Sequence, residues 1–220
     1  MSTLYSFGKI AVAPVLRGIW RPRVGGLDNI PASGPVILAA NHLSVVDSIV
    51  VPCVVPRPVY YLAKNQYFKG PMRLVMEGLN QIPVDRTGGR AALLALDAAI
   101  PVLRAGKVLG IHPEGTRSLD GRLYRGRPGA AKLAVETGAT LVPVGLVGTD
   151  RIQPVGARLP RLAKVEVTFG EPLDLSDWAG APADARTVRE ITERLMKRIA
   201  KLTGQQYTDR YAKLPSRAEP

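Results

Sequence analysis

Short apolar runs and longer amphipathic stretches alternate along this chain of 220 residues. The apolar runs have the length of buried strands. Pro143 is expected to interrupt one of them, and the run at 164–169 alternates like a strand with one exposed face, which places it at a sheet edge. The predicted strands span 36–40, 59–63, 81–84, 108–111, 140–147 and 164–169. Helices are predicted between them, at 72–78, 88–104, 129–137 and, most clearly, 187–202.

This order of elements predicts an α/β fold in one domain, with a mixed, mostly parallel sheet flanked by helices. We assign 1–23 to an N-terminal amphipathic helix, 24–204 to the α/β domain, and 205–220 to a C-terminal tail that is expected to be partly disordered. Ligands of such sheets bind beyond the carboxyl ends of the strands. The polar segments that follow predicted strands are 41–47, Lys64, 85–86 and 114–117.

The N-terminal stretch 2–21 is apolar over a wide face, and its polar residues, among them Lys9, Arg17 and Arg21, recur at helical spacing. A helix with a basic stripe that ends in Trp20 is typical of one lying in an anionic lipid interface. An amphipathic helix packed on the core has the same pattern, so both interpretations stand. Pro14 is expected to kink or divide this helix.

Composition narrows the class of partner. The chain has 30 Lys and Arg against 18 Asp and Glu, a net charge of +12. These cations are scattered and aromatic residues are few, which favours a membrane surface or a phosphorylated substrate over nucleic acid. No apolar run approaches the roughly 20 residues of a membrane-spanning helix, and no secretory leader is evident. The lone Cys53 is expected to be a buried thiol in a reducing compartment.

One of the two histidines, His42, follows the first predicted strand and precedes Asp47 by five residues. Residues five apart on a regular helix do not share a face. If Ser44 is the N-cap of a helix, Asp47 takes position N3 and His42 can fold back over the first turn. The segment then fits two interpretations, a capped helix with a polar loop residue, or a general base with its orienting acid.

Missing motifs limit the chemistry. The sequence has no Gly-x-Ser-x-Gly elbow, Walker loop, Gly-x-Gly-x-x-Gly fingerprint or zinc-ligand pattern, which disfavours hydrolases, NTPases, dinucleotide enzymes and zinc sites. What remains is a His/Asp pair with arginines. His42 can take the proton of a substrate hydroxyl while Asp47 stabilises the imidazolium, and the oxygen then attacks an acyl carbonyl. Arginines suit a phosphate on that substrate.

Four segments resemble the ordered blocks of the glycerolipid acyltransferases related to 1-acylglycerol-3-phosphate acyltransferase, over roughly residues 24–170. They are Asn41-His42-x-x-x-x-Asp47, Ile82-Pro83-Val84-Asp85-Arg86, Pro113-Glu114-Gly115-Thr116-Arg117-Ser118 and Leu141-Val142-Pro143-Val144. The resemblance implies that His42 is the base and Asp47 its partner. It implies acceptor-phosphate binding and site structure for Arg86, Glu114, Gly115, Thr116 and Arg117, and an accessory phosphate contact for Lys64.

The resemblance also implies the reaction. A fatty acyl group would pass from acyl-CoA or acyl carrier protein, as co-substrate, to the free hydroxyl of a lysophospholipid, giving phosphatidic acid without a metal or other cofactor. The enzyme would be peripheral, on the cytoplasmic side of the cell membrane. Acceptors such as glycerol-3-phosphate or another lysolipid or glycolipid stay open, as does a non-catalytic basic membrane-binding protein. Two departures are His112, where the third block commonly begins with Phe, and Arg127-Pro128 before Gly129. His112 could titrate near the site or simply pack.

Overall fold

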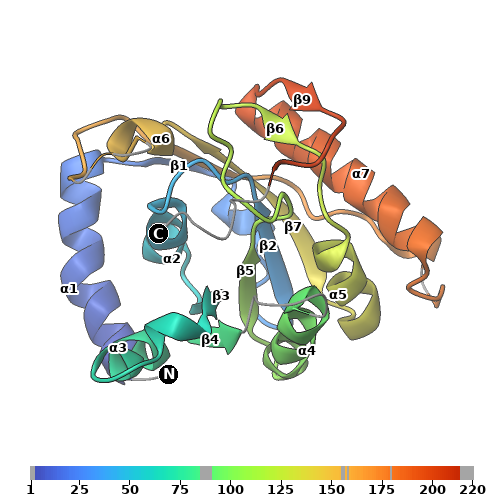
Figure 1. Cartoon of the computed structure of the whole chain (residues 1–220), viewed down its shortest axis with the longest axis horizontal. Coiled ribbons are helices and arrows are strands. Elements are labelled where there is room, and N and C mark those ends of the chain that lie inside the picture. The colour runs from blue at the N-terminus through green and yellow to red at the C-terminus, as the bar shows by residue number, and fades with distance from the viewer. Residues whose placement is uncertain (1–2, 85–90, 155–156, 158, 179, 214–220) are drawn as a thin grey trace.

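The computed structural model describes residues 3–84, 91–154, 157, 159–178 and 180–213 (Figure 1). A seven-stranded sheet runs through the centre of the molecule, in the order β1-β8-β7-β2-β5-β3-β4. All neighbouring strands in it are parallel except β7 and β8. Its strands are β1 (Arg23–Gly25), β2 (Val36–Ala40), β3 (Val59–Lys64), β4 (Gln81–Val84), β5 (Val108–Ile111), β7 (Thr140–Val147) and β8 (Glu166–Phe169). The predicted fold class is confirmed.

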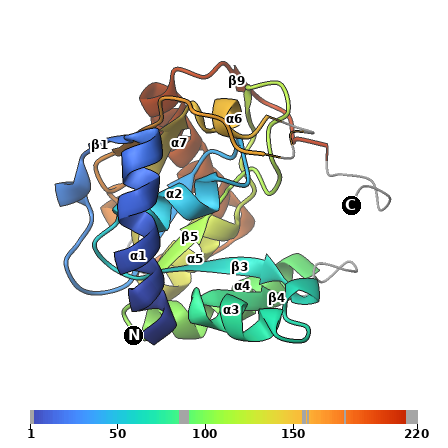
Figure 2. The same cartoon turned by 90° about the vertical axis from the view of Figure 1, so that its left-hand side faces the viewer.

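Helices cover both faces of the sheet (Figures 1 and 2). On one side lie α1 (Thr3–Trp20) and α2 (Asp47–Val54), and on the other lie α4 (Ala91–Arg104), α5 (Gly129–Thr137) and α7 (Ala185–Thr203). The shorter helices are α3 (Met72–Gly78) and α6 (Thr149–Ile152). Because both faces are covered, the five residues of the central strand β2 are all buried, which explains its uninterrupted apolar sequence.

The strand predictions hold at the centre of the sheet and are wrong at one side. Residues 23–25 form the edge strand β1, so β8 lies between β1 and β7 and not at the edge. β1 has three exposed residues and no apolar run, so it leaves no periodic signal. Pro143 does not interrupt β7, where it lies opposite Ala39 in the ladder. A proline removes a single N–H donor, and the rest of the ladder keeps the strand intact.

Helix α1 runs through Pro14 as one element, so the predicted division did not occur. Its basic residues are used within the protein. Lys9 Nζ donates to the carbonyl oxygens of Val55 and Pro56, and an Arg17 guanidinium nitrogen donates to Cys53 O at 2.7 Å. These carbonyls lie at the carboxyl end of α2, where cations stabilise the helix. The basic stripe therefore docks α1 onto α2, and the exposed side of α1 carries Ile10, Val15 and Ile19.

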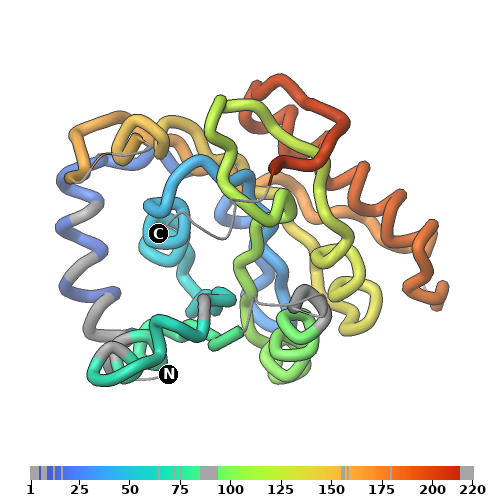
Figure 3. The backbone as a smooth tube through the Cα atoms, in the orientation of Figure 1, coloured from blue at the N-terminus to red at the C-terminus, as the bar shows by residue number. Residues whose placement is uncertain are grey.

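Residues 205–213 of the predicted tail pack on the domain, and its remainder, 214–220, lies outside the described residues. Tyr207–Thr208 forms β9, which pairs in parallel with β6 (Leu123–Tyr124) in a two-stranded sheet. Figure 3 shows this last segment crossing the loop that carries β6. The loop between β5 and α5, where a site was predicted, is thus held by the end of the chain.

Candidate functional site

Strand β2 ends at Ala40, which places His42, the predicted base, at the carboxyl edge of the sheet. Asn41, fully buried, extends the β2–β7 ladder through its side chain. Its Nδ2 donates to Leu146 O at 2.9 Å, and its Oδ1 accepts from Leu146 N at 2.8 Å. Nδ2 also donates to Gln205 Oε1 at 2.9 Å. These bonds fix the backbone immediately before His42.

His42 and Asp47 form a hydrogen-bonded pair. His42 Nδ1 lies 2.9 Å from Asp47 Oδ2, and the imidazole is 18% exposed while the carboxylate is fully buried. The same Oδ2 accepts the backbone amides of Leu43 at 2.7 Å and Ser44 at 2.8 Å. Three donors therefore converge on one carboxylate oxygen, which orients the ring and assigns the Nδ1–H tautomer to His42.

The helix that carries Asp47 begins later than the sequence suggested. α2 starts at Asp47 itself, with Val46 in the capping position, so the assignment of Ser44 as the N-cap of this helix is wrong. One half of the expected capping geometry is nevertheless present, because the Asp47 carboxylate accepts the Ser44 amide three residues back. Ser44 Oγ accepts Val46 N at 3.4 Å and donates to Gln153 O at 3.3 Å, so it does not reach the amide of Asp47.

The charge state of Asp47 follows from its surroundings. Burial alone would raise the pKa of this carboxyl, but the hydrogen bond with His42, the neighbouring His112 ring and the Ser44 amide outweigh burial and hold the pKa below its usual value. Asp47 is therefore ionised at neutral pH. A buried anion bonded to Nδ1 favours the imidazolium form of His42 whenever its other nitrogen takes a proton.

Glu114 joins the first and third sequence blocks. It is fully buried, its Oε1 accepts His42 N at 3.0 Å, and its Oε2 accepts Tyr124 N at 2.9 Å. Burial raises the pKa of Glu114 to about 7, while the two amides act in the opposite direction. The backbone of His42 is held from its other side as well, since Ser118 N donates to His42 O at 2.7 Å. Glu114 thus supports the His42 backbone, and no contact links it to Arg117.

His112 lies directly against His42. The two imidazoles stack in parallel, with centroids 4.0 Å apart and an interplanar angle of 10°. His112 Nδ1 lies 3.2 Å from both Ala40 O and Asn41 O, so this nitrogen carries the proton, and Nε2 lies 3.5 Å from Ser48 Oγ. Burial lowers the pKa of His112 to about 3, so the ring is neutral at neutral pH. His112 is therefore a packing residue, and it packs against His42, the predicted base.

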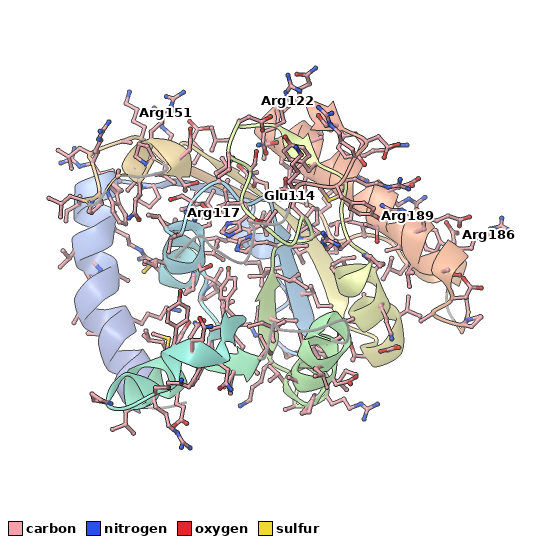
Figure 4. All side chains as sticks on the ribbon, in the orientation of Figure 1. Glu114, Arg117, Arg122, Arg151, Arg186 and Arg189 are labelled. Atoms are coloured by element: carbon pink, nitrogen blue, oxygen red, sulfur yellow. The ribbon has the colours of Figure 1, made fainter. Side chains whose placement is uncertain are left out.

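The turn after Pro113 contains Gly115, Thr116 and Arg117. Gly115 has φ +77°, and a Cβ there would approach Arg127 Nε at 2.7 Å, so both conformation and space favour glycine. Thr116 is half-buried and Arg117 is exposed. Figure 4 labels Glu114 and Arg117 near the carboxyl end of β5; Glu114 is buried there and Arg117 is exposed.

The end of the chain braces this loop, which the sequence did not suggest. Gln205 bridges Asn41 to the loop, since its Nε2 donates to Gly121 O at 2.8 Å. The Arg125 and Arg127 guanidinium groups lie over the Tyr211 ring, 5.5 and 5.3 Å from its centroid. No local pattern marks Gln205 as a partner of Asn41, because the contact depends on a packed fold.

The remaining predicted residues are only partly placed. Lys64 is the last residue of β3, at the same edge of the sheet as Ala40, but the placement of its side chain is not described. Arg86 and its neighbour Asp85 lie outside the described residues. Across the part of the chain that the structure describes, no three His, Cys, Asp or Glu side chains gather in a way that would hold a metal ion. The site consists of a His/Asp pair, a buried glutamate, a stacked imidazole and an exposed arginine.

Comparison with known proteins places this arrangement in a family. The family model described as Acyltransferase matches residues 21–147, which include His42, Asp47 and the whole turn from Pro113 to Ser118. A 1-acyl-sn-glycerol-3-phosphate acyltransferase of Bacillus subtilis is 30% identical over 202 residues, covering 90% of this chain and 96% of the relative. One of Borreliella burgdorferi is 34% identical over 128 residues, or 58% of this chain.

The chain spans 51% of the length of the Borreliella burgdorferi relative and 39% of a chloroplastic relative from Arabidopsis thaliana. Among solved structures, PlsC from Thermotoga maritima, described as a 1-acyl-sn-glycerophosphate acyltransferase, matches with a TM-score of 0.66 and 26% identity. The match covers 88% of this chain and 80% of that one. By its family match and by its similarity to these proteins, the chain belongs to the acyltransferase family, in the group that resembles 1-acylglycerol-3-phosphate acyltransferases.

Proposed function

We propose that this protein transfers a fatty acyl group from acyl-CoA or acyl carrier protein to the free hydroxyl of 1-acylglycerol-3-phosphate, giving phosphatidic acid. The observation that carries the proposal is the bond of 2.9 Å between His42 Nδ1 and buried Asp47, inside the segment that the family model matches. The printed names of the relatives and of the structural neighbour support the choice of acceptor.

The proposed reaction begins at Nε2 of His42, since Nδ1 is bonded to Asp47. Nε2 takes the proton of the acceptor hydroxyl as its oxygen attacks the carbonyl carbon of the thioester. Asp47 stabilises the imidazolium that forms. When the tetrahedral intermediate collapses, the carbon–sulfur bond breaks, and the thiolate that leaves takes the proton back from His42. One ester bond has formed, one thioester bond has broken, and the base is regenerated.

The basic residues of the site are proposed to bind the phosphate of the acceptor. Arg117 is exposed on a rigid turn, and a guanidinium group offers a pair of parallel donors to phosphate oxygens. Lys64, at the end of β3, and Arg86, from the second sequence block, are proposed as further contacts. Gly115 and Thr116 shape the turn that presents Arg117. The absence of a metal requirement is part of the proposal, because neutralisation of the phosphate falls to these side chains.

The protein is further proposed to act as a peripheral protein on the cytoplasmic side of the cell membrane. No helix in the described part of the chain is long and apolar enough to cross a bilayer. The exposed side of α1 carries Ile10, Val15 and Ile19, at 74%, 57% and 49% exposure. A lipid interface would cover these side chains, and the net charge of +12 favours anionic lipid.

An acceptor panel tests the proposal. Purified protein is incubated with one acyl-CoA, or the matching acyl carrier protein, and with lysophosphatidate, glycerol-3-phosphate or lysophosphatidylcholine, and thiol release and lipid mass are recorded. We expect phosphatidic acid from lysophosphatidate as the main product. Arg117→Ala should lower kcat/KM for lysophosphatidate more than for an acceptor without a terminal phosphate. Equal losses for both acceptors would remove Arg117 from phosphate binding, and no product from any acceptor would reject the proposed function.

A further inference from the structure

Two leucines in the loop between α6 and β8 stand out into solvent. Leu162 and Leu159 are 80% and 78% exposed, the highest fractions among the large apolar side chains that the structure describes. Single exposed leucines are common and need no explanation, but these two lie three residues apart with cations between and beside them. The segment reads Leu159-Pro160-Arg161-Leu162-Ala163-Lys164.

The backbone of this loop is held in place, so the leucines project from a fixed support. Arg161 N donates to Ile152 O at 2.7 Å, which ties the loop to α6. Arg161 O accepts from Trp20 Nε1 at 3.2 Å, which ties it to the carboxyl end of α1. Ala163 packs against the core cluster on this side of the sheet. The two leucines are therefore displayed by a loop with three attachments.

The loop and α1 form one surface. A cavity of about 420 Å³ lies between them, lined by Ile19 and Trp20 from α1, by Arg21 and Arg23, and by residues 162–165. Figures 1 and 2 both show the loop beside the carboxyl end of α1. Ile19 and Leu162 line the same cavity, so an exposed apolar residue at the carboxyl end of α1 lies beside the loop.

Strand register places this surface at the edge of the sheet where His42 lies. β8 begins at Glu166, directly after the loop, and Glu166 pairs with Val147 at the end of β7 and with Arg23 at the start of β1. On the other side of β7, Val144 pairs with Ala40, two residues before His42. A surface that contacts the loop and the end of α1 thus approaches the carboxyl edge of the sheet.

The charges around the two leucines favour an anionic lipid surface as the binding partner. Arg21, Arg23, Arg161 and Lys164 are at or beside the leucines, and only Arg23 has an acidic partner among the described residues, Glu166 at 3.5 Å. Apolar side chains that enter hydrocarbon, ringed by cations that meet phosphate groups, are the pattern of an interfacial membrane contact.

We propose that the loop 159–164 is a second membrane contact, which inserts Leu159 and Leu162 into an anionic bilayer beside α1 and turns the carboxyl edge of the sheet toward the lipid. This inference rests on the proposed function and deepens it. Contact through α1 alone would leave the molecule free to rotate about that helix. Two contacts fix the orientation in which a lipid acceptor can reach His42 without leaving the surface.

The test compares two double variants, Leu159→Gln/Leu162→Gln and a matched control, Leu79→Gln/Leu94→Gln. Leu79 precedes the amino end of β4 and Leu94 lies on α4, and both are exposed. Each protein is sedimented with vesicles of phosphatidylcholine alone or mixed equally with phosphatidylglycerol. We expect the loop variant to bind the anionic vesicles about tenfold or more weakly than wild type, and the control to bind within about twofold of it.

Turnover of a short-chain, monomeric lysophosphatidate without vesicles separates this inference from the proposed function. The loop variant should match wild type in that assay and lose rate only with vesicle-bound acceptor. If the loop variant sediments like wild type, the second contact is refuted whatever the activity. If wild type binds both vesicle types equally, the role of the cations is refuted. If light scattering shows that wild type self-associates and the loop variant does not, the loop is an interface between copies and the proposal fails.

Discussion

Replacing Glu114 by glutamine tests the proposal that this buried carboxylate ties the third sequence block to His42. In the wild type each oxygen accepts one backbone amide, from His42 at 3.0 Å and from Tyr124 at 2.9 Å. Glutamine keeps one acceptor and turns an NH₂ group toward the second amide. A buried amide without a partner costs about 1–3 kcal/mol, so Glu114→Gln should lower the free energy of unfolding by that amount at acidic pH.

The difference between the two proteins should depend on pH, with a definite sign. The pKa of Glu114 is about 7 in the folded protein, against an ordinary value of 4.5. Between those values the folded state holds the proton more tightly than the unfolded chain does. The stabilisation is therefore complete below pH 4.5 and is lost as the pH rises through 7. The two pKa values predict that wild type loses about 2.5 kcal/mol relative to Glu114→Gln between pH 5 and pH 8.

Urea unfolding followed by circular dichroism at pH 5, 6, 7 and 8 measures this difference. The glutamine variant serves as the control for wild type at each pH, because every other titrating group is present in both proteins. The free energy of unfolding of wild type should exceed that of Glu114→Gln at pH 5, and this difference should narrow or reverse as the pH rises. A gap that stays constant across this range would mean that Glu114 is ionised throughout and that burial does not control its proton.

Three further substitutions probe the surroundings of His42. Asp47→Asn should keep both backbone hydrogen bonds through its amide oxygen but remove the charge that stabilises the imidazolium, so kcat should fall about 10²-fold or more; its NH₂ group takes the place of Oδ1, which is buried without a partner, so the urea midpoint should fall too. An unchanged kcat would contradict the pairing. His112→Phe should keep the stacked ring and stay near wild-type activity, whereas His112→Ala should lower kcat about two- to tenfold; equal losses in both would show that the hydrogen bonds of His112 matter more than its stacking. Gln205→Ala removes two hydrogen bonds, which should lower the free energy of unfolding by about 1–3 kcal/mol, measured by urea denaturation, and an unaffected midpoint would show that the bridge to Asn41 is not needed.

The central sheet could be predicted from the sequence because its strands are buried on both faces and read as short apolar runs. The pairing of His42 with Asp47 was also accessible, since a helix beginning near Asp47 brings a residue five positions back into reach. The residue that caps α2 could not be predicted in this way. Ser44 fits the residue preferences of a cap, but its hydroxyl accepts Val46 N, ahead of the helix, and donates to Gln153 O, a partner 109 positions away.

Contacts that depend on tertiary packing could not be predicted from the sequence. The basic stripe of α1 suggested lipid or core packing, yet Lys9 and Arg17 bind the carbonyl oxygens at the end of α2. The helix buries Tyr5, Ala13 and Trp20 and exposes Ile10, Val15 and Ile19. The edge strand β1 and the two-residue strand β9 are too short to show a period. The stacking of His112 on His42 joins residues 70 positions apart, and only the parallel pairing of β2 with β5 brings them together.

The most direct test of the account is the turnover of His42→Ala with lysophosphatidate and acyl-CoA, measured as thiol release together with the mass of the lipid product. Circular dichroism and vesicle sedimentation serve as controls for folding and membrane binding. Wild type should release one thiol for each phosphatidic acid formed, and His42→Ala should fold, bind vesicles and lose about 10²-fold or more of that rate. A folded His42→Ala protein that forms phosphatidic acid at close to the wild-type rate would contradict the account.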